Sequence, residues 1–151
     1  MCIIALVMTM NESKQILSAM LKTIQMGQVD IRSVLDTSLG SSLRSTLQTQ
    51  LREYDSMEAE AYTIALQRGW ELPELDPGKR FLRDRFTRMK LTGPDTDSRI
   101  ADLLILGNTK GMIQGLRQLH QSENRDQQIR ILSQKLLDCE TAHIRQMQNF
   151  L

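Results

Sequence analysis

The chain has 151 residues, a formal net charge of +1, 40% hydrophobic residues and 25% charged residues. This length fits one domain with a buried core, and a charge so close to zero excludes a global attraction to nucleic acid or to acidic membranes. Aromatic residues make up only 4%, and runs of β-branched residues are few, which favours helices over sheets. The composition therefore predicts a soluble, all-α protein.

The two cysteines, Cys2 and Cys139, do not form a CxxC pair. One stands at the N-terminus and the other inside a predicted helix, so we expect no disulfide and a reducing, cytoplasmic location. Residues 1–10 are almost wholly apolar, but they are too few to span a bilayer and lack a basic start. We interpret them as an apolar N-terminal extension, with a later start codon as the alternative, and expect no transmembrane segment.

Two long amphipathic helices are predicted in the first half of the chain. The first covers about residues 11–36 and the second about residues 41–69, each with apolar residues three or four positions apart. Ser41 or Ser42 is the expected N-cap of the second helix, and Gly69 is expected to end it. Because only a short turn separates the two helices, they should pack antiparallel.

The helical pattern breaks between Trp70 and Pro94, where prolines and glycines bracket a short helix at about residues 79–91. A third long helix is predicted for about residues 98–121. It is apolar nearly all round, which indicates a heavily buried element. Residues 122–125 form a second tight turn, and a fourth long helix follows to the C-terminal end. The single domain is thus placed at residues 11–151.

The layout is two helical hairpins joined by one long crossover that carries a short extra helix. The hairpins look like diverged copies, since Ile24-Gln-Met-Gly27 corresponds to Leu104-Ile-Leu-Gly107. The chain resembles the small bacterial ferritin-like four-helix bundles, including spore-coat-related families of unknown function, over roughly residues 15–151. The segment Ile105–Ile113 is similar to a glycine-containing stretch of their third helix. The resemblance implies an all-α, ferritin-like four-helix bundle and no particular activity.

Carboxylate and imidazole side chains on the second and fourth helices are candidate metal ligands. A carboxylate followed three residues later by His is half of the ligand set of a carboxylate-bridged di-iron bundle, whose other two helices each supply a Glu. On the fourth helix this step is complete, and on the second it has Glu in place of His. The candidate ligands are Asp55, Glu58, Glu140 and His143.

Antiparallel pairing about the two turns predicts that these candidates face residues without a carboxylate, namely Met20, Thr23, Leu103 and Leu106. We therefore expect no cofactor. The preferred interpretation is a polar pair of Glu58 and His143 at the bundle centre, because an isolated buried charge is costly. The alternative is a site for iron, manganese or zinc.

Two further features are candidates for interaction. Gly107, Gly111 and Gly115 repeat every four residues along the third helix. Small residues at this spacing allow a tight contact with the first helix, or leave a groove for a ligand or a partner helix. The crossover helix is basic on one side and could contact an anionic surface, although it is more simply explained as a cover for the bundle. Its candidate contact residues are Arg80, Arg83, Arg85 and Arg88.

No pattern of nucleophilic catalysis or of a phosphate-binding loop is found, and we predict no catalytic residue. We expect a non-enzymatic structural or interaction protein that self-associates as a homo-oligomer through an exposed helix face, or that binds another protein. One alternative is a metal-binding or redox protein that uses Glu58, Glu140 and His143. The other is binding of an anionic surface or nucleic acid through residues 79–91, although a nucleic-acid partner is not expected.

Overall fold

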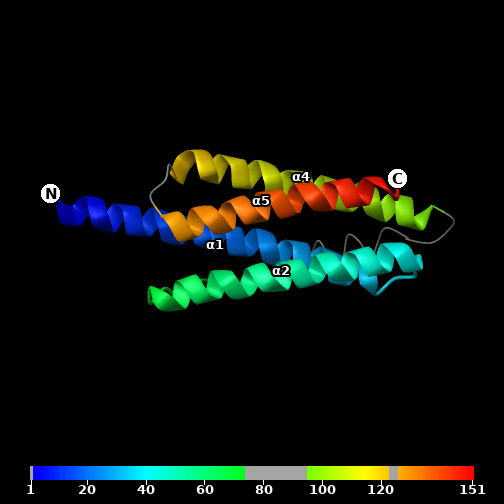
Figure 1. The fold of residues 1–151 in the computed structure, drawn as a ribbon, viewed down its shortest axis with the longest axis horizontal. Coiled ribbons are helices and arrows are strands. Elements are labelled where there is room, and N and C mark those ends of the chain that lie inside the picture. The colour runs from blue at the N-terminus through cyan, green and yellow to red at the C-terminus, as the bar shows by residue number, and fades with distance from the viewer. Residues whose placement is uncertain (1, 74–94, 123–125) are drawn as a thin grey trace.

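The computed structural model describes residues 2–73, 95–122 and 126–151. Within these ranges the regular structure is entirely helical (Figure 1). The all-α prediction is confirmed. The predicted helix at residues 79–91 lies outside the described residues. The long helices are α1 (Cys2–Leu35), α2 (Ser41–Gln67), α4 (Thr96–Ser122) and α5 (Gln127–Gln148).

The long helices alternate in direction around the bundle (Figure 1). The Gly40 amide before α2 donates a hydrogen bond to Asp97 in the first turn of α4, over 3.2 Å. Arg68, just after α2, donates to Asp126, just before α5, over 2.9 Å. Helix α2 therefore begins beside the start of α4 and ends beside the start of α5. Since α1 packs on α2 and α4, and α5 packs on α4 and α2, each helix is antiparallel to both neighbours.

The first helix is longer than predicted, because residues 2–10 form its first turns. These turns project beyond the ends of the neighbouring helices (Figure 1). Ile3 and Ile4 are accordingly 76% and 70% exposed. None of the helices in the described ranges combines the length and the apolar composition that a membrane crossing requires.

The two ends of α2 can be compared with the residues that were predicted to begin and end this helix. Gly40 occupies the N-cap position without a side-chain cap, so the prediction of Ser41 or Ser42 as N-cap is wrong. The end of α2 is confirmed, because Gly69 follows it with φ +66°. A residue with a Cβ would be strained in this left-handed conformation, which is why glycine is common there.

The core lies along the bundle axis and consists of the apolar stripes that predicted the helices. Burying one large apolar side chain stabilises the fold by about 1.5–3 kcal/mol, so this stripe supplies most of the favourable free energy. Its fully buried members include Leu17, Met20, Leu21 and Ile24 of α1, Leu43, Leu47 and Ala61 of α2, Ile100 of α4, and Met147 of α5.

Helix α4 is less buried than predicted. Leu106, Ile113 and Leu116 are 54%, 43% and 44% exposed. The reason is geometric: α4 packs on α1 and α5, and neither covers the side that carries these residues. The prediction of a heavily buried third helix is therefore wrong.

The register of the first hairpin also differs from the prediction. Asp55 accepts a hydrogen bond from Gln28 over 2.8 Å, whereas simple pairing about the turn places it opposite Thr23. The offset exceeds one helical turn. The connecting loop explains it, because its last residue, Gly40, is extended (φ −58°, ψ 147°). The chain therefore advances along the axis, and α2 begins beyond the end of α1.

Candidate metal site between α2 and α5

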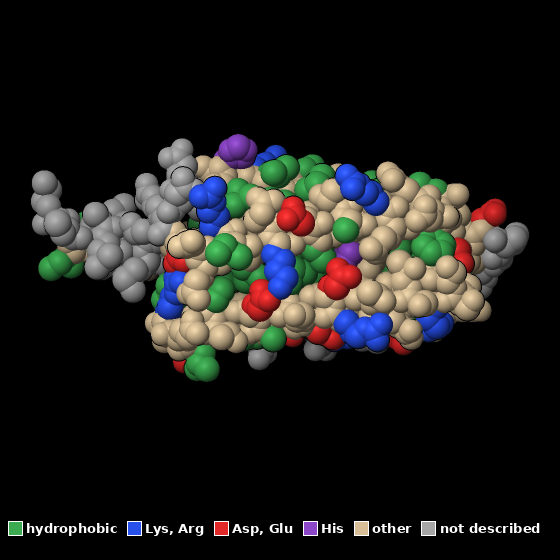
Figure 2. Space-filling model, viewed as in Figure 1, with side chains coloured by type: hydrophobic (Ala, Val, Ile, Leu, Met, Phe, Trp, Pro, Cys, Tyr) green, Lys and Arg blue, Asp and Glu red, His purple; other side chains and the backbone are tan. Residues whose placement is uncertain are grey.

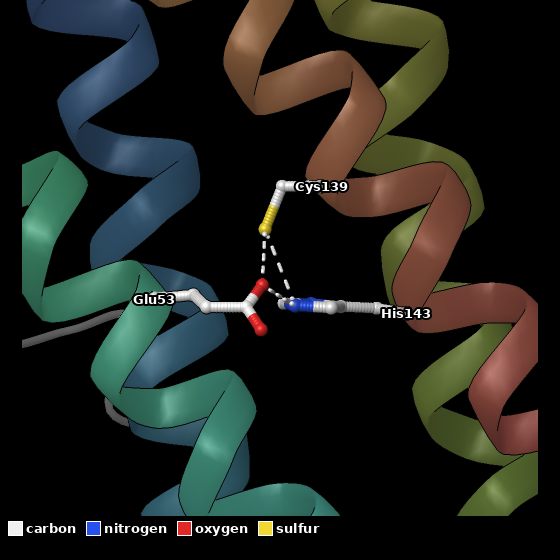
Figure 3. A group of neighbouring side chains, drawn as sticks. All are labelled: Glu53, Cys139 and His143. Atoms are coloured by element: carbon white, nitrogen blue, oxygen red, sulfur yellow. Dashed lines mark hydrogen bonds and ion pairs between the residues drawn. The ribbon is translucent and has the colours of Figure 1, made fainter.

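Glu53 of α2 meets Cys139 and His143 of α5 where the two helices pack together (Figure 3). His143 Nε2 lies 3.0 Å from Glu53 Oε2 and 3.2 Å from Cys139 Sγ. The Cys139 thiol donates to the same Glu53 oxygen over 3.3 Å. Cys139 and His143 are four residues apart and so share one face of α5. One ligand atom from each of the three residues lies within 4.8 Å of the other two.

Burial sets the protonation states in this group. His143 is completely buried, whereas the side chain of Glu53 is 42% exposed. Burial lowers the pKa of His143, although the bond to Glu53 opposes this effect. Burial is the main cause that raises the pKa of the Cys139 thiol far above its usual range, and the hydrogen bond to Glu53 adds to this effect. Near neutral pH the group therefore holds a neutral imidazole and a protonated thiol.

Packing holds the imidazole in place. The rings of Tyr54 and His143 meet edge to face, with centroids 5.0 Å apart and planes at 81°. In the part of the chain that the structure describes, His143 Nδ1 has no hydrogen-bond partner. The ring orientation is therefore set by packing against Tyr54 and by Glu53 at Nε2.

The outer face over α2 and α5 carries charges of both signs, side by side (Figure 2). Lys135 of α5 donates to Glu60 of α2 and so bridges the two helices one turn away from Cys139. This ion pair is about half exposed, so solvent screens it and its contribution to stability is small. The pair shows which residues of the two helices lie opposite each other next to the three-residue group.

The structure places Asp55 and Glu58 away from His143. Asp55 accepts from Gln28 over 2.8 Å, and Glu58 accepts from Gln25 over 3.2 Å. Both predicted ligands therefore lie between α1 and α2, where amide groups satisfy them. The group that forms around His143 in the described ranges consists of Glu53 and Cys139 instead.

Glu140 lies in a different environment from His143, although only three residues separate them. It is 2% exposed, and its Oε1 accepts from the Tyr54 hydroxyl over 3.0 Å. Burial raises the pKa of Glu140 to about 8, while the bond from Tyr54 opposes this shift. The register prediction for the second hairpin is also wrong, because Glu140 faces Gly111 rather than Leu106.

The predicted glycine stripe of α4 faces other helices. A Cβ added at Gly107 would lie 3.6 Å from Asp30 of α1, and one at Gly111 would lie 3.4 Å from Glu140 of α5. At Gly115 it would lie 2.9 Å from a leucine of α5. The stripe is therefore a helix contact, with carboxyl groups beside Gly107 and Gly111 and a leucine beside Gly115. The other predicted interaction residues, Arg80, Arg83, Arg85 and Arg88, lie outside the described residues.

Sequence reasoning missed Glu53 and Cys139 as members of the group. One signal was available, because Cys139 and His143 have the four-residue spacing that brings two ligands together on a helix. No local signal identifies Glu53, since its position depends on how α2 and α5 pack. Comparisons with protein-family models, curated proteins and solved structures find no match to this chain. A function is therefore inferred from the side chains themselves.

Proposed function

We propose that the protein is a metal-binding four-helix bundle of the ferritin-like plan, and that it holds one zinc-class divalent ion at Glu53, Cys139 and His143. The observation that carries the proposal is the convergence of one oxygen, one nitrogen and one sulfur donor within 4.8 Å. The ferritin-like plan is supported by the helix directions, because two antiparallel hairpins whose second and third helices are parallel require a long crossover.

The donor chemistry favours zinc. Thiolate ligands select zinc over magnesium, calcium and manganese, and imidazole and carboxylate are also common zinc ligands. In a tetrahedral zinc site these donors lie about 3.3–3.6 Å apart, given typical bond lengths. The three separations here are 3.0, 3.2 and 3.3 Å. Zinc would therefore need to move the ligands by only a few tenths of an ångström.

The site is open on one side. Three protein ligands leave the fourth zinc position for water or another small ligand, unlike the closed sites of purely structural zinc. The 42% exposure of the Glu53 side chain supports access of water to that position. A bound cation would also reverse the local electrostatics, because coordination favours the thiolate that burial alone disfavours.

Zinc binding by the purified protein tests this proposal. Protein prepared without chelator or metal-affinity tag should contain or take up one Zn²⁺ per chain, measured by elemental analysis and by competition with a chromogenic chelator. Cys139→Ser and Glu53→Gln should each weaken binding by about tenfold or more, because even outer-shell losses reach that size. Co²⁺ should give a thiolate charge-transfer band that Cys139→Ser abolishes.

The chain offers matched controls, since it has one other cysteine and one other histidine. Cys2→Ser and His120→Ala should leave the zinc affinity unchanged. Equal affinities for Cys139→Ser and Cys2→Ser would refute the proposal, as would a folded wild-type protein that binds no stoichiometric zinc.

A second candidate function is self-association with another copy of this chain through the open face of α4. Leu106, Ile113 and Leu116 form an exposed apolar row on that face, and a two-fold axis can place such a row against itself. Sedimentation velocity over a concentration series should show an oligomer that Ile113→Lys dissociates. Ile131→Lys on α5, a site that is 61% exposed, is the control and should have no effect. A wild-type protein that stays monomeric at all concentrations would exclude this function.

A further inference from the structure

A second group of polar side chains lies inside the bundle and takes one residue from each long helix. Tyr54 of α2 donates to Glu140 of α5 over 3.0 Å and lies 3.3 Å from the Asn108 side-chain oxygen of α4. Asp30 of α1 lies beside the same helix, α4, because a Cβ added at Gly107 would lie 3.6 Å from its Oδ2, and, in addition to burial, its charge helps to raise the pKa of both Tyr54 and Glu140. All four side chains carry oxygen atoms, and none carries sulfur or imidazole.

Two carboxylate oxygens in this group have no partner. Glu140 is 2% exposed, and its Oε2 is buried without a hydrogen bond. Asp30 Oδ1 is also buried without a hydrogen bond among the described residues. Buried polar atoms almost always have a hydrogen-bond partner. A polar atom that loses its hydrogen bonds to water and gains no new partner costs free energy. Unpaired carboxyl oxygens on α1 and α5 therefore lack a partner among the described residues, and this partner is either a bound proton or a metal cation.

Glycines create the space for this group. A Cβ at Gly107 would lie 3.6 Å from Asp30 Oδ2, and one at Gly111 would lie 3.4 Å from Glu140 Oε1. Larger side chains at either position would fill the space beside the carboxylates. The two glycines, four residues apart on α4, thus place Asp30 and Glu140 against neighbouring turns of one helix.

We propose that Asp30 and Glu140 bind a hard divalent cation, of the Mg²⁺, Mn²⁺ or Ca²⁺ class, with Asn108 and Tyr54 as neighbouring oxygen groups. Carboxylate, amide and hydroxyl oxygens are the ligands that these cations prefer, and two carboxylates neutralise a double charge. The site differs from the zinc-class group in both its residues and its donor atoms. It does not depend on the proposed function, although Tyr54 touches both groups.

Mn²⁺ is the probe, because the electron paramagnetic resonance signal of the free ion reports binding directly. Wild-type protein and Cys139→Ser should each bind one Mn²⁺ per chain. Asp30→Asn and Glu140→Gln should each weaken this binding by about tenfold or more. These two changes preserve shape and replace a buried carboxyl group with an amide, so both variants should fold, which far-UV circular dichroism checks. Mn²⁺ should also raise the Tm of the wild-type protein and leave the Tm of these two variants unchanged.

Glu58→Gln is the matched control, since Glu58 is a carboxylate that an amide of Gln25 already satisfies. It should bind Mn²⁺ as the wild-type protein does. Loss of Mn²⁺ binding in Cys139→Ser would place the ion at the thiol group and overturn the proposal. Absence of saturable Mn²⁺, Mg²⁺ and Ca²⁺ binding in the wild-type protein would overturn it too. Zinc binding and Mn²⁺ binding are read out separately, so either can fail alone.

Discussion

Two glycine-to-alanine changes in helix interiors should have opposite effects on stability. Alanine favours a helix over glycine by about 0.8–1.0 kcal/mol. At Gly107 the new methyl group would lie 3.6 Å from Asp30 Oδ2, an ordinary contact, so Gly107→Ala should stabilise the protein by about 0.5–1 kcal/mol. At Gly27 it would lie 2.6 Å from Tyr54 Cζ. Tyr54 is 1% exposed and bonded to Glu140, so its ring cannot move aside freely.

Overpacking of this kind typically costs about 1–3 kcal/mol. A contact this short belongs in the upper half of that range. After the gain in helix propensity, Gly27→Ala should destabilise the protein by about 1–2 kcal/mol. Urea unfolding followed by circular dichroism should therefore separate the two variants by about 1.5–3 kcal/mol. If Gly27→Ala proves as stable as Gly107→Ala, then Tyr54 is not packed against α1 as described, and the reasoning about the centre of the bundle fails with it.

Two further changes test the helix ends. Asp126→Ala removes the N-cap of α5 and the partner of Arg68, and should cost about 1–2 kcal/mol at pH 7. Because Arg68 lowers the pKa of Asp126, this contribution is present above the usual aspartate pKa and disappears as the pH falls through the lower folded value. Urea unfolding at pH 7 and at acid pH should show the difference from wild type shrinking. Arg44→Ala removes donors to the Leu35 carbonyl (2.9 Å) and to a loop carbonyl after α1, and should cost about 1–2 kcal/mol. Arg52→Ala, at an exposed side chain, should change the unfolding free energy little.

The helices could be predicted because their signal is local. Apolar residues three and four apart, such as Leu17, Met20 and Leu21, identify one face of a helix without knowledge of its neighbours. How much of a helix is buried depends on how many helices surround it. The apolar residues of α4 extend around most of its circumference, yet Leu106 and Ile113 remain exposed because its packing partners lie on other sides.

The candidate site was predicted only in part. It depends on the direction in which each residue points around its helix axis and on the register between paired helices. Residues three apart differ by about 60° around a helix axis. That difference lets His143 point toward Glu53 while Glu140 points toward Tyr54. The register across each hairpin depends on the path of its loop, and an offset of about one turn changes which side chains face each other. With the observed register, α1 does bring a carboxyl group, that of Asp30, against Gly107 of α4.

Tyr54 explains how two groups of different chemistry can lie side by side without merging. Its ring packs edge to face with that of His143, which presents Nε2 to the sulfur and oxygen donors on one side of α5. Its hydroxyl bonds to Glu140, which keeps that carboxylate on the other side. The tyrosine fits only because Gly27 has no side chain. A glycine that weakens α1 locally is therefore needed to separate a sulfur-containing donor set from an oxygen-only one.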